Sequence, residues 1–326
     1  MATLSEKVRI MRPNIRDSSL TMYLANLKKY NQEKGVDDPQ DISTLRDLKF
    51  MDSFFKKRKN NTVKNYLASF VVLSMTNGKM AKITEKLRKM MEEKAEVINT
   101  FHQSQEKSEA QMENWVSLED LQKIVNNYLS EINKKKLFEK SNIFNEDGER
   151  KVYSKEDKCL IQKYLIGSLF VADPINNPPL RADYNMKIVT QEQYEDLEGQ
   201  DLKKNYLVIR SRNRKYFSLG DYKTEGKYGL KKIKLGSKLN SVMNRVLPTI
   251  NNDNLISDTN GNGISPSGLS KLVVKTFEPT GKKVGINMIR HIVITTLYPP
   301  NLSEKSKTAD LMAHSVAQSE LYSKKE

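Results

Sequence analysis

Three short segments decide how the rest of the chain is interpreted: Asn287-Met288-Ile289-Arg290-His291, then Ala313-His314-Ser315, and then Leu321-Tyr322. A second arginine, Arg181, stands far upstream in Pro178-Pro179-Leu180-Arg181-Ala182-Asp183. Two arginines can hold a phosphate diester through bidentate hydrogen bonds from groups that are always charged. A histidine can donate a further bond to the same oxygens, and a tyrosine hydroxyl can attack the phosphorus. None of these residues is specific by itself, but their order and spacing are.

The composition favours a polyanionic partner. The 326 residues carry a formal net charge of +15 and a pI of about 9.5, which favours nucleic acid first and an acidic membrane second. The longest apolar stretch, from Cys159 to Ala172, is interrupted by Gln162 and Lys163 and is too short to span a bilayer. Residues 1–20 hold scattered charges and no apolar core, so we expect no signal peptide and no membrane association.

Cysteine and histidine usage limits the remaining possibilities. Cys159 is the single cysteine, which fits a reducing compartment and predicts an intracellular protein. The three histidines, His102, His291 and His314, are too scattered to suggest a metal site.

Residues 1–104 are predicted to form a helical domain. Apolar residues recur at helical spacing from about Ser18 to Gly35, Ser43 to Lys57 and Thr62 to Gly78, and a Lys/Glu-rich helix follows from about Ile83 to past Phe101. The apolar stripes predict core packing, while residues 1–100 hold 20 Lys/Arg against 12 Asp/Glu. The run Lys56-Lys57-Arg58-Lys59 predicts contact with DNA phosphates, or equally a solvated last helical turn favoured by the helix dipole.

A polar linker is expected over residues 105–116, and residues 117–326 are expected to form a second, mixed α/β domain. Helices are predicted near Ser117 and from Ser154 to Val171. Alternating segments predict strands over Tyr206–Ile209, Lys215–Leu219 and Lys231–Leu235. The predicted fold class is therefore mainly α with a small antiparallel β-sheet.

Positive charge is concentrated around these strands. Residues 201–250 contain 13 Lys/Arg and 3 Asp/Glu. The glycine-containing turn from Lys223 to Gly229 would present this charge to a nucleic-acid groove. The alternative is an exposed sheet edge that lysines protect against aggregation.

On these residues, the chain from about Ser117 to Tyr322 resembles the tyrosine recombinases, or phage-type integrases, and the helical block before it resembles their core-binding domain. Four residues match the family pattern. Arg181 is followed two positions later by Asp183, and Arg290 matches the arginine of the family's His-x-x-Arg-His segment. His314 and Tyr322 match a Gly-His-Ser segment that is followed by a tyrosine. Lys223 in Asp221-Tyr222-Lys223-Thr224 is the match to its hairpin lysine, with Lys227 in reserve. The Asn-Pro-Pro-Leu-Arg and Asp-Tyr-Lys-Thr phrases resemble the divergent branch of eukaryotic viruses, virophages and DNA transposons.

The resemblance implies a site-specific recombinase that cuts and rejoins double-stranded DNA as a homo-tetramer. Tyr322 would attack phosphorus and form a 3′-phosphotyrosine, Arg181, Arg290 and His314 would stabilise the charged oxygens, and Lys223 would protonate the departing 5′-oxygen. The covalent link conserves the bond energy, so no cofactor is expected. A viral or mobile element would place the reaction in the host nucleus or a viral replication compartment.

Two features depart from the family pattern: Asn287, and a tail of only four residues, Ser323 to Glu326, after Tyr322. Asn287 stands where the family has His or Lys, and asparagine cannot shuttle a proton near neutral pH. His291, one position past Arg290, is predicted to point elsewhere on the helix and to be structural. Two alternatives stay open: a type IB topoisomerase with similar chemistry, and a DNA-binding protein whose site has decayed.

Overall fold

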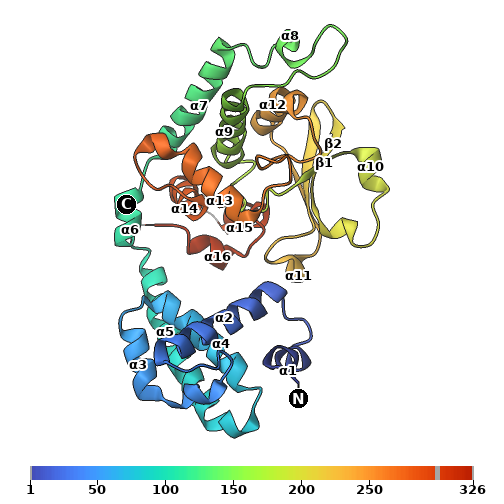
Figure 1. Ribbon diagram of the computed structural model, residues 1–326. Coiled ribbons are helices and arrows are strands. Elements are labelled where there is room, and N and C mark those ends of the chain that lie inside the picture. The colour runs from blue at the N-terminus through green and yellow to red at the C-terminus, as the bar shows by residue number, and fades with distance from the viewer. Residues whose placement is uncertain (1, 298–301, 325–326) are drawn as a thin grey trace. The chain divides into compact units, whose positions relative to one another are not determined.

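The chain forms two compact units, Met1–Ser104 and Gln105–Glu326, in a computed structural model that describes residues 2–297 and 302–324. Helices dominate both units, and the second unit adds a small four-stranded sheet (Figure 1). The fold class predicted from the sequence, mainly α with a small sheet, is confirmed.

The first unit is a set of helices around an aromatic core. Its α-helices are α1 (Leu4–Met11), α2 (Asp17–Lys34), α3 (Leu48–Lys56), α4 (Asn60–Ser74) and α5 (Ala81–Ser104). The Tyr30 ring is fully buried and lies 5.0 Å from the rings of both Phe54 and Phe70 in edge-on contacts. The helix expected from Ser43 to Lys57 is divided, because the Asp47 side chain accepts the Phe50 N–H and begins α3 there.

The second unit carries its helices in a layered arrangement with the sheet. Its α-helices are α6 (Glu109–Asn114), α7 (Leu118–Lys134), α8 (Lys140–Ile143), α9 (Lys155–Val171), α10 (Gln191–Glu195), α11 (Glu225–Tyr228), α12 (Ser237–Val246), α13 (Pro266–Thr276), α14 (Ile286–Leu297), α15 (Leu302–Leu311) and α16 (Val316–Glu320). Helix α9 is buried over most of its length and packs against α7, α12 and α13. The short helix α6 lies within the segment that the sequence suggested as a linker.

The sheet is mixed, which corrects the expectation of an antiparallel one. Its strands are β1 (Lys187–Thr190), β2 (Asn205–Ser211), β3 (Arg214–Leu219) and β4 (Lys231–Lys234), in the order β1-β2-β3-β4. Strands β2, β3 and β4 pair antiparallel as predicted, but β1 pairs parallel with β2. Residues 191–204, which include α10, form the crossover that a parallel pair requires. Strand β1 was missed because it is short and shows no clear alternation.

The two faces of the sheet pack against different elements. Tyr206 and Val208 on β2 face a small cluster with Tyr194 of α10, whereas Leu207 between them and Phe217 of β3 join the large helical core. This alternation follows from the two-residue period of a strand. The sheet is therefore covered by α10 on one face and by the main helices on the other (Figure 1).

The buried side chain of Asn205, at the start of β2, fastens two loops to the sheet. Its Nδ2 group donates to the carbonyl oxygens of Asp183 and Asp221, at 3.2 and 2.8 Å. Its Oδ1 atom accepts from the backbone N–H groups of Gly220 and Asp221, at 3.1 and 2.9 Å. One amide thus holds the segment after Arg181 and the segment before Lys223 at the same end of the sheet.

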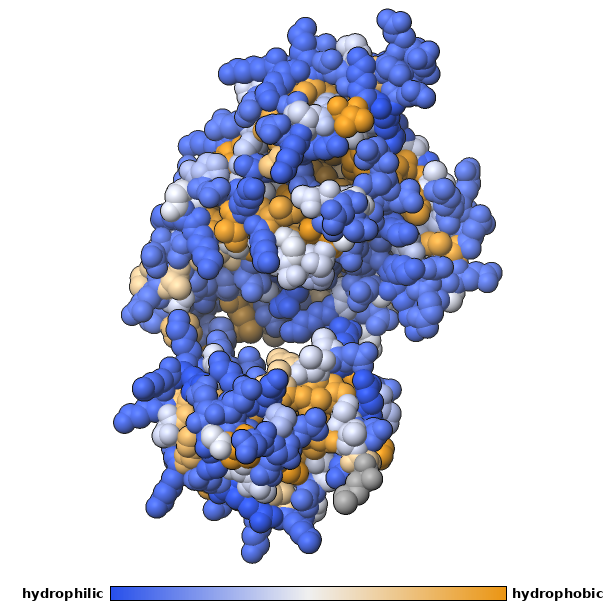
Figure 2. Space-filling view, in the orientation of Figure 1, coloured by the Kyte–Doolittle hydropathy of each residue, from blue (hydrophilic) through white to orange (hydrophobic). Residues whose placement is uncertain are grey.

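The surface agrees with the strongly polar composition. Hydrophilic residues cover most of the visible face of both units, with scattered apolar ones between them (Figure 2). Across residues 2–297 and 302–324, no helix has the length and apolar character needed to cross a membrane.

Replacing Asn205 by alanine should destabilise the second unit by ~2–4 kcal/mol, because four backbone groups lose a partner in a mostly buried place. Urea unfolding followed by the fluorescence of Trp115, the single tryptophan, measures this unit. The matched control is Asn213→Ala in the exposed β2–β3 turn, which should change stability by less than ~0.5 kcal/mol. Equal effects of the two substitutions would contradict the tethering role.

Candidate active site

Arg290 lies on the buried face of α14 and is fully buried. Its neighbours on that face are apolar, so the helix places a guanidinium within an apolar stripe. One nitrogen, Nη1, donates to the carbonyl oxygen of Pro179. The other two, Nε and Nη2, are buried and make no hydrogen bond among the described residues. Burial lowers the pKa of Arg290, which reflects the free energy that an unpaired buried charge costs.

The Pro179–Tyr184 segment brings the second arginine to the same place. Leu180 is buried, and its N–H donates to the Tyr184 hydroxyl at 3.2 Å, while that hydroxyl donates to the carbonyl oxygen of Leu169 at 2.9 Å. With Leu180 fixed inward, Arg181 points to the site, and its Nη2 atom lies 3.4 Å from the Tyr322 hydroxyl.

Tyr322 follows α16 directly and is only 5% exposed. The guanidinium carbon of Arg290 lies 4.7 Å from the centre of its ring. Burial by itself raises the pKa of Tyr322, but the positive charges of Arg290 and Arg181 outweigh it and lower the pKa below its usual value. The hydroxyl is therefore easier to ionise than that of an ordinary tyrosine.

His314 completes the group from the end of α15. The helix ends at Leu311, and Ala313, two residues later, has a left-handed backbone (φ 56°) that glycine adopts more readily. The His314 ring stacks on the Tyr322 ring, with 5.8 Å between their centres. The structure thus brings together Arg181, Arg290, His314 and Tyr322 from four separate segments.

The protonation state of His314 follows from its contacts. Nδ1 lies 3.1 Å from the carbonyl oxygen of Ser315. A carbonyl only accepts, so Nδ1 carries the proton and donates it. Burial, helped by the nearby charge of Arg290, lowers the pKa of His314 to about 4. At neutral pH the ring is therefore uncharged, and its buried Nε2 is an acceptor with no partner among the described residues.

The remaining predicted residues lie at the edge of this group. Lys223 and Lys227 are exposed in the β3–β4 connection, and Asn287 is exposed one helical turn before Arg290. In the described part of the chain, no hydrogen bond joins these three side chains to Tyr322. The Lys223 segment is nonetheless attached to the site, because the Thr224 hydroxyl donates to the carbonyl oxygen of Ala313 at 2.7 Å.

His291, which was predicted to be structural and to point elsewhere on the helix than Arg290, lies against Tyr322. Its Nδ1 atom lies 2.9 Å from the carbonyl oxygen of Tyr322, and its ring centre lies 4.9 Å from that of Tyr322. A position one residue after Arg290 is turned by about 100° around the helix, which directs His291 to the C-terminal segment. No local pattern reveals where that segment lies.

The basic run of the first unit is not uniform. Lys56, Lys57 and Lys59 are exposed. Arg58 instead lies over the Phe54 ring at 3.6 Å and pairs with Glu33 through both carboxylate oxygens, at 2.6 and 2.8 Å. Three of the four predicted phosphate contacts are thus open to solvent, while the fourth side chain is used in packing.

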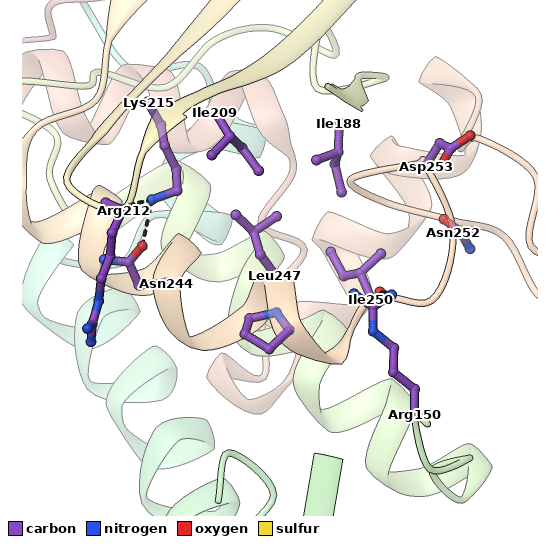
Figure 3. Close-up of a pocket in the computed structure, with 11 residues that line it drawn as sticks. Arg150, Ile188, Ile209, Arg212, Lys215, Asn244, Leu247, Ile250, Asn252 and Asp253 are labelled. Atoms are coloured by element: carbon purple, nitrogen blue, oxygen red, sulfur yellow. Dashed lines mark hydrogen bonds between the residues drawn. The ribbon is translucent and has the colours of Figure 1, made fainter. Parts of the chain in front are cut away.

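A pocket of about 650 Å³ lies beside the sheet (Figure 3), and Tyr322 is not among the residues that line it. Lys215 in its wall is buried, because it shares a strand face with Phe217. Its ammonium group donates to the Arg212 carbonyl and to the side-chain oxygen of Asn244 (Figure 3), and also to the side-chain oxygen of Asn240. All three of its protons are used, so this lysine is structural.

Comparisons with known proteins add little to this geometry. No protein-family model matches the chain, and no curated protein matches it. Among solved structures, it is similar to a crystal structure of XerA recombinase, with a TM-score of 0.38 and 13% identity over 99% of this chain and 93% of that chain. A likeness at this low TM-score and identity carries no argument about chemistry, which therefore depends on the residues themselves.

The neutral buried His314 makes the second unit less stable in acid. Its pKa is about 4 in the folded chain and about 6.5 in an unfolded one. Between these values the unfolded chain binds a proton that the folded one does not, so stability is lost as pH falls from 6.5 to 4, by on the order of 3 kcal/mol. Urea unfolding at pH 7 and pH 4.5, followed by Trp115 fluorescence, should show this loss.

The His314→Asn variant should show a smaller loss over the same pH range, because it removes the titrating ring. His102→Asn in the first unit serves as the control and should keep the wild-type dependence. An unchanged pH dependence in His314→Asn would refute the assignment.

Proposed function

We propose that this chain is a DNA strand-breaking and rejoining enzyme of the tyrosine recombinase type, with Tyr322 as its nucleophile. The observation that carries the proposal is the buried guanidinium of Arg290, with two unpartnered nitrogens beside the Tyr322 ring. Buried polar groups are almost always hydrogen-bonded in proteins, so these two donors of a buried cation are suited to bind an anion that enters the site. A second guanidinium at the tyrosine hydroxyl makes a phosphate diester the anion that fits both groups.

The reaction is a transfer between two oxygens. The Tyr322 hydroxyl gives its proton to water, and its oxygen attacks phosphorus as the bond from phosphorus to the 5′-oxygen breaks. The DNA 3′ end is then linked to the tyrosine, and the 5′-oxygen takes up a proton to become a hydroxyl. Arg181 and Arg290 stabilise the negative charge that develops on the non-bridging oxygens and also favour the phenolate before attack. Attack by the 5′-hydroxyl reverses these steps.

The roles of the other residues follow from their protonation. Lys223, on an exposed loop attached to the site through Thr224, would donate the proton to the 5′-oxygen. His314 donates to a phosphate oxygen from Nε2 only when its ring is protonated, which the bound anion would favour. Without the anion, Nε2 can accept a proton. Asn287 can hydrogen-bond an oxygen but cannot carry a proton.

Site-specific strand exchange by a homo-tetramer on double-stranded DNA is the outcome we propose for this chemistry. The resemblance of the sequence to tyrosine recombinases supports it, including the phrases shared with viral and transposon relatives. The net charge of +15 supports a DNA partner, and the exposed Lys56, Lys57, Lys59 and Lys227 would contact phosphates. In a virus or mobile element the reaction would integrate or excise DNA in the host nucleus or a viral replication compartment.

A covalent-trapping experiment tests the proposal. The substrate is a pool of nicked DNA duplexes of randomised sequence. After cleavage, the short 5′-hydroxyl fragment between the cut and the nick dissociates, so the strand cannot be rejoined and the covalent adduct accumulates. We expect an SDS-resistant protein–DNA complex whose linked peptide contains Tyr322. Tyr322→Phe should abolish it, whereas Tyr153→Phe, a distant tyrosine bound to the Leu137 carbonyl, should retain it.

Arg290→Met provides the complementary control. It should lower the rate of adduct formation by about 10³-fold or more, because one anion-stabilising donor set is lost. Its stability should stay equal or rise, since a buried unpaired charge is removed. Absence of any wild-type adduct would favour the decayed DNA-binding protein. If the protein relaxes supercoiled plasmid but does not exchange strands between two copies of a cleavage site identified from the pool, the topoisomerase would be favoured.

The hydroxyl and both arginines belong to the same chain, so cleavage should occur in cis. Mixing Tyr322→Phe with Arg290→Met should therefore give no adduct, because neither chain holds a complete site. When Tyr322→Phe is mixed with wild type, the amount of adduct should be proportional to the amount of wild-type protein in the mixture. Restoration of adduct by the two inactive variants would instead indicate that the tyrosine is delivered to a neighbouring subunit.

A further inference from the structure

Two side chains on one face of α14 bind the backbone around Tyr322. His291 and Thr295 are four residues apart, so they lie one helical turn from each other on the same face. Nδ1 of His291 lies 2.9 Å from the carbonyl oxygen of Tyr322, and because a carbonyl only accepts, Nδ1–H is the donor. The N–H of Lys324 donates to the Thr295 hydroxyl oxygen at 2.9 Å.

Further contacts hold the segment from Tyr322 to Lys324 against the rest of the second unit. The His291 ring packs on the Tyr322 ring with 4.9 Å between their centres. Lys324 is only 5% exposed, and its Nζ atom donates to the carbonyl oxygen of Glu106 at 3.2 Å. The backbone is thus fixed at Tyr322 and again two residues later, and both fixed points belong to the helix that carries Arg290.

We propose that His291 and Thr295 form a clasp that positions Tyr322 beside Arg181 and Arg290. They are positioning residues, since His291 binds the Tyr322 carbonyl and Thr295 binds the Lys324 N–H, and neither hydrogen bond involves the reacting hydroxyl. The proposal rests on the proposed function for the use of Tyr322, but the clasp itself can be measured without DNA.

The need for such a clasp follows from the local structure before Tyr322. Helix α16 has only five residues, and so short a helix is marginal by itself and gives the following residue little support. Attack on phosphorus requires the oxygen to lie within a narrow range of distance and angle, and a displacement of about 1 Å can reduce a rate about 100-fold. Two hydrogen bonds from one rigid helix restrict the backbone on which the ring is carried.

The test uses matched pairs of variants that keep or remove one donor or acceptor. Thr295→Val keeps the shape and loses the acceptor, whereas Thr295→Ser keeps the hydroxyl. His291→Ala loses the donor, whereas His291→Asn places a side-chain N–H at the position of Nδ1. Each pair separates loss of the hydrogen bond from a general effect of substitution.

The first measurement is the titration of Tyr322, observed by NMR of chains labelled with ¹³Cζ-tyrosine and assigned with Tyr322→Phe. In wild type the two guanidinium groups keep the pKa of Tyr322 below its usual value. If the clasp is lost and the ring moves away from them, the pKa should rise in Thr295→Val and His291→Ala. It should stay low in Thr295→Ser and His291→Asn. A merely structural role would leave the titration unmoved.

The second measurement is hydrogen exchange of the Lys324 amide, in chains labelled with ¹⁵N-lysine. Its exchange should become at least 10-fold faster in Thr295→Val and stay near wild type in Thr295→Ser. The third is the single-turnover rate of adduct formation at saturating DNA, which should fall 10- to 100-fold in Thr295→Val and His291→Ala with DNA affinity unchanged.

The outcomes separate the clasp from the proposed function. Wild-type titration and exchange in Thr295→Val and His291→Ala would overturn the clasp even if the enzyme is active. Altered titration and exchange in these variants, with no adduct from wild type on any DNA, would support the clasp and refute the proposed function.

Discussion

The hydrogen bond from Arg290 to the carbonyl oxygen of Pro179 joins segments 111 residues apart, and the geometry of the site depends on it. It fixes a guanidinium within the apolar face of α14 and brings the Pro179–Tyr184 segment, with Arg181, to that helix. A buried cation without a counterion is unfavourable for folding, so the remaining packing of the unit must offset it. The large helical core, which includes Ile289 and Val293 on either side of Arg290 in sequence, supplies that packing.

The charges around Tyr322 all act in one direction. The two arginines lower the pKa of the tyrosine and, together with burial, the pKa of His314. Asp183, two residues after Arg181, does not fully neutralise the two arginines. Burial raises the pKa of its carboxyl even though both arginines act to lower it. A site with this excess of positive charge attracts an anion before any bond changes. If the proposed phosphate diester binds here, its charge would raise the pKa of His314 again, so the free and bound states of the site would differ in protonation.

The sequence was informative wherever chemistry follows from residue type, and weak wherever it depends on long-range packing. Arg181, Arg290, His314 and Tyr322 could be grouped because their order along the chain is distinctive, and the structure places them together. The antiparallel strands were readable from alternation, but β1 was not, since four residues paired with a distant strand leave little pattern. His291, Asn205 and Thr295 were missed because their partners are backbone atoms far along the chain. Arg58 looked like its lysine neighbours, and only the fold shows that it stacks on Phe54.

The hydrogen bond between Thr224 and the carbonyl oxygen of Ala313 has a mechanical consequence. That carbonyl belongs to the peptide unit leading directly into His314, and Ala313 adopts a backbone conformation that an alanine tolerates less well than a glycine. Because this hydrogen bond links the Lys223 loop to the peptide that precedes His314, the positions of the lysine and of the imidazole are coupled through the backbone at Ala313. Two side chains that lie far apart along the chain are thus placed by one local arrangement.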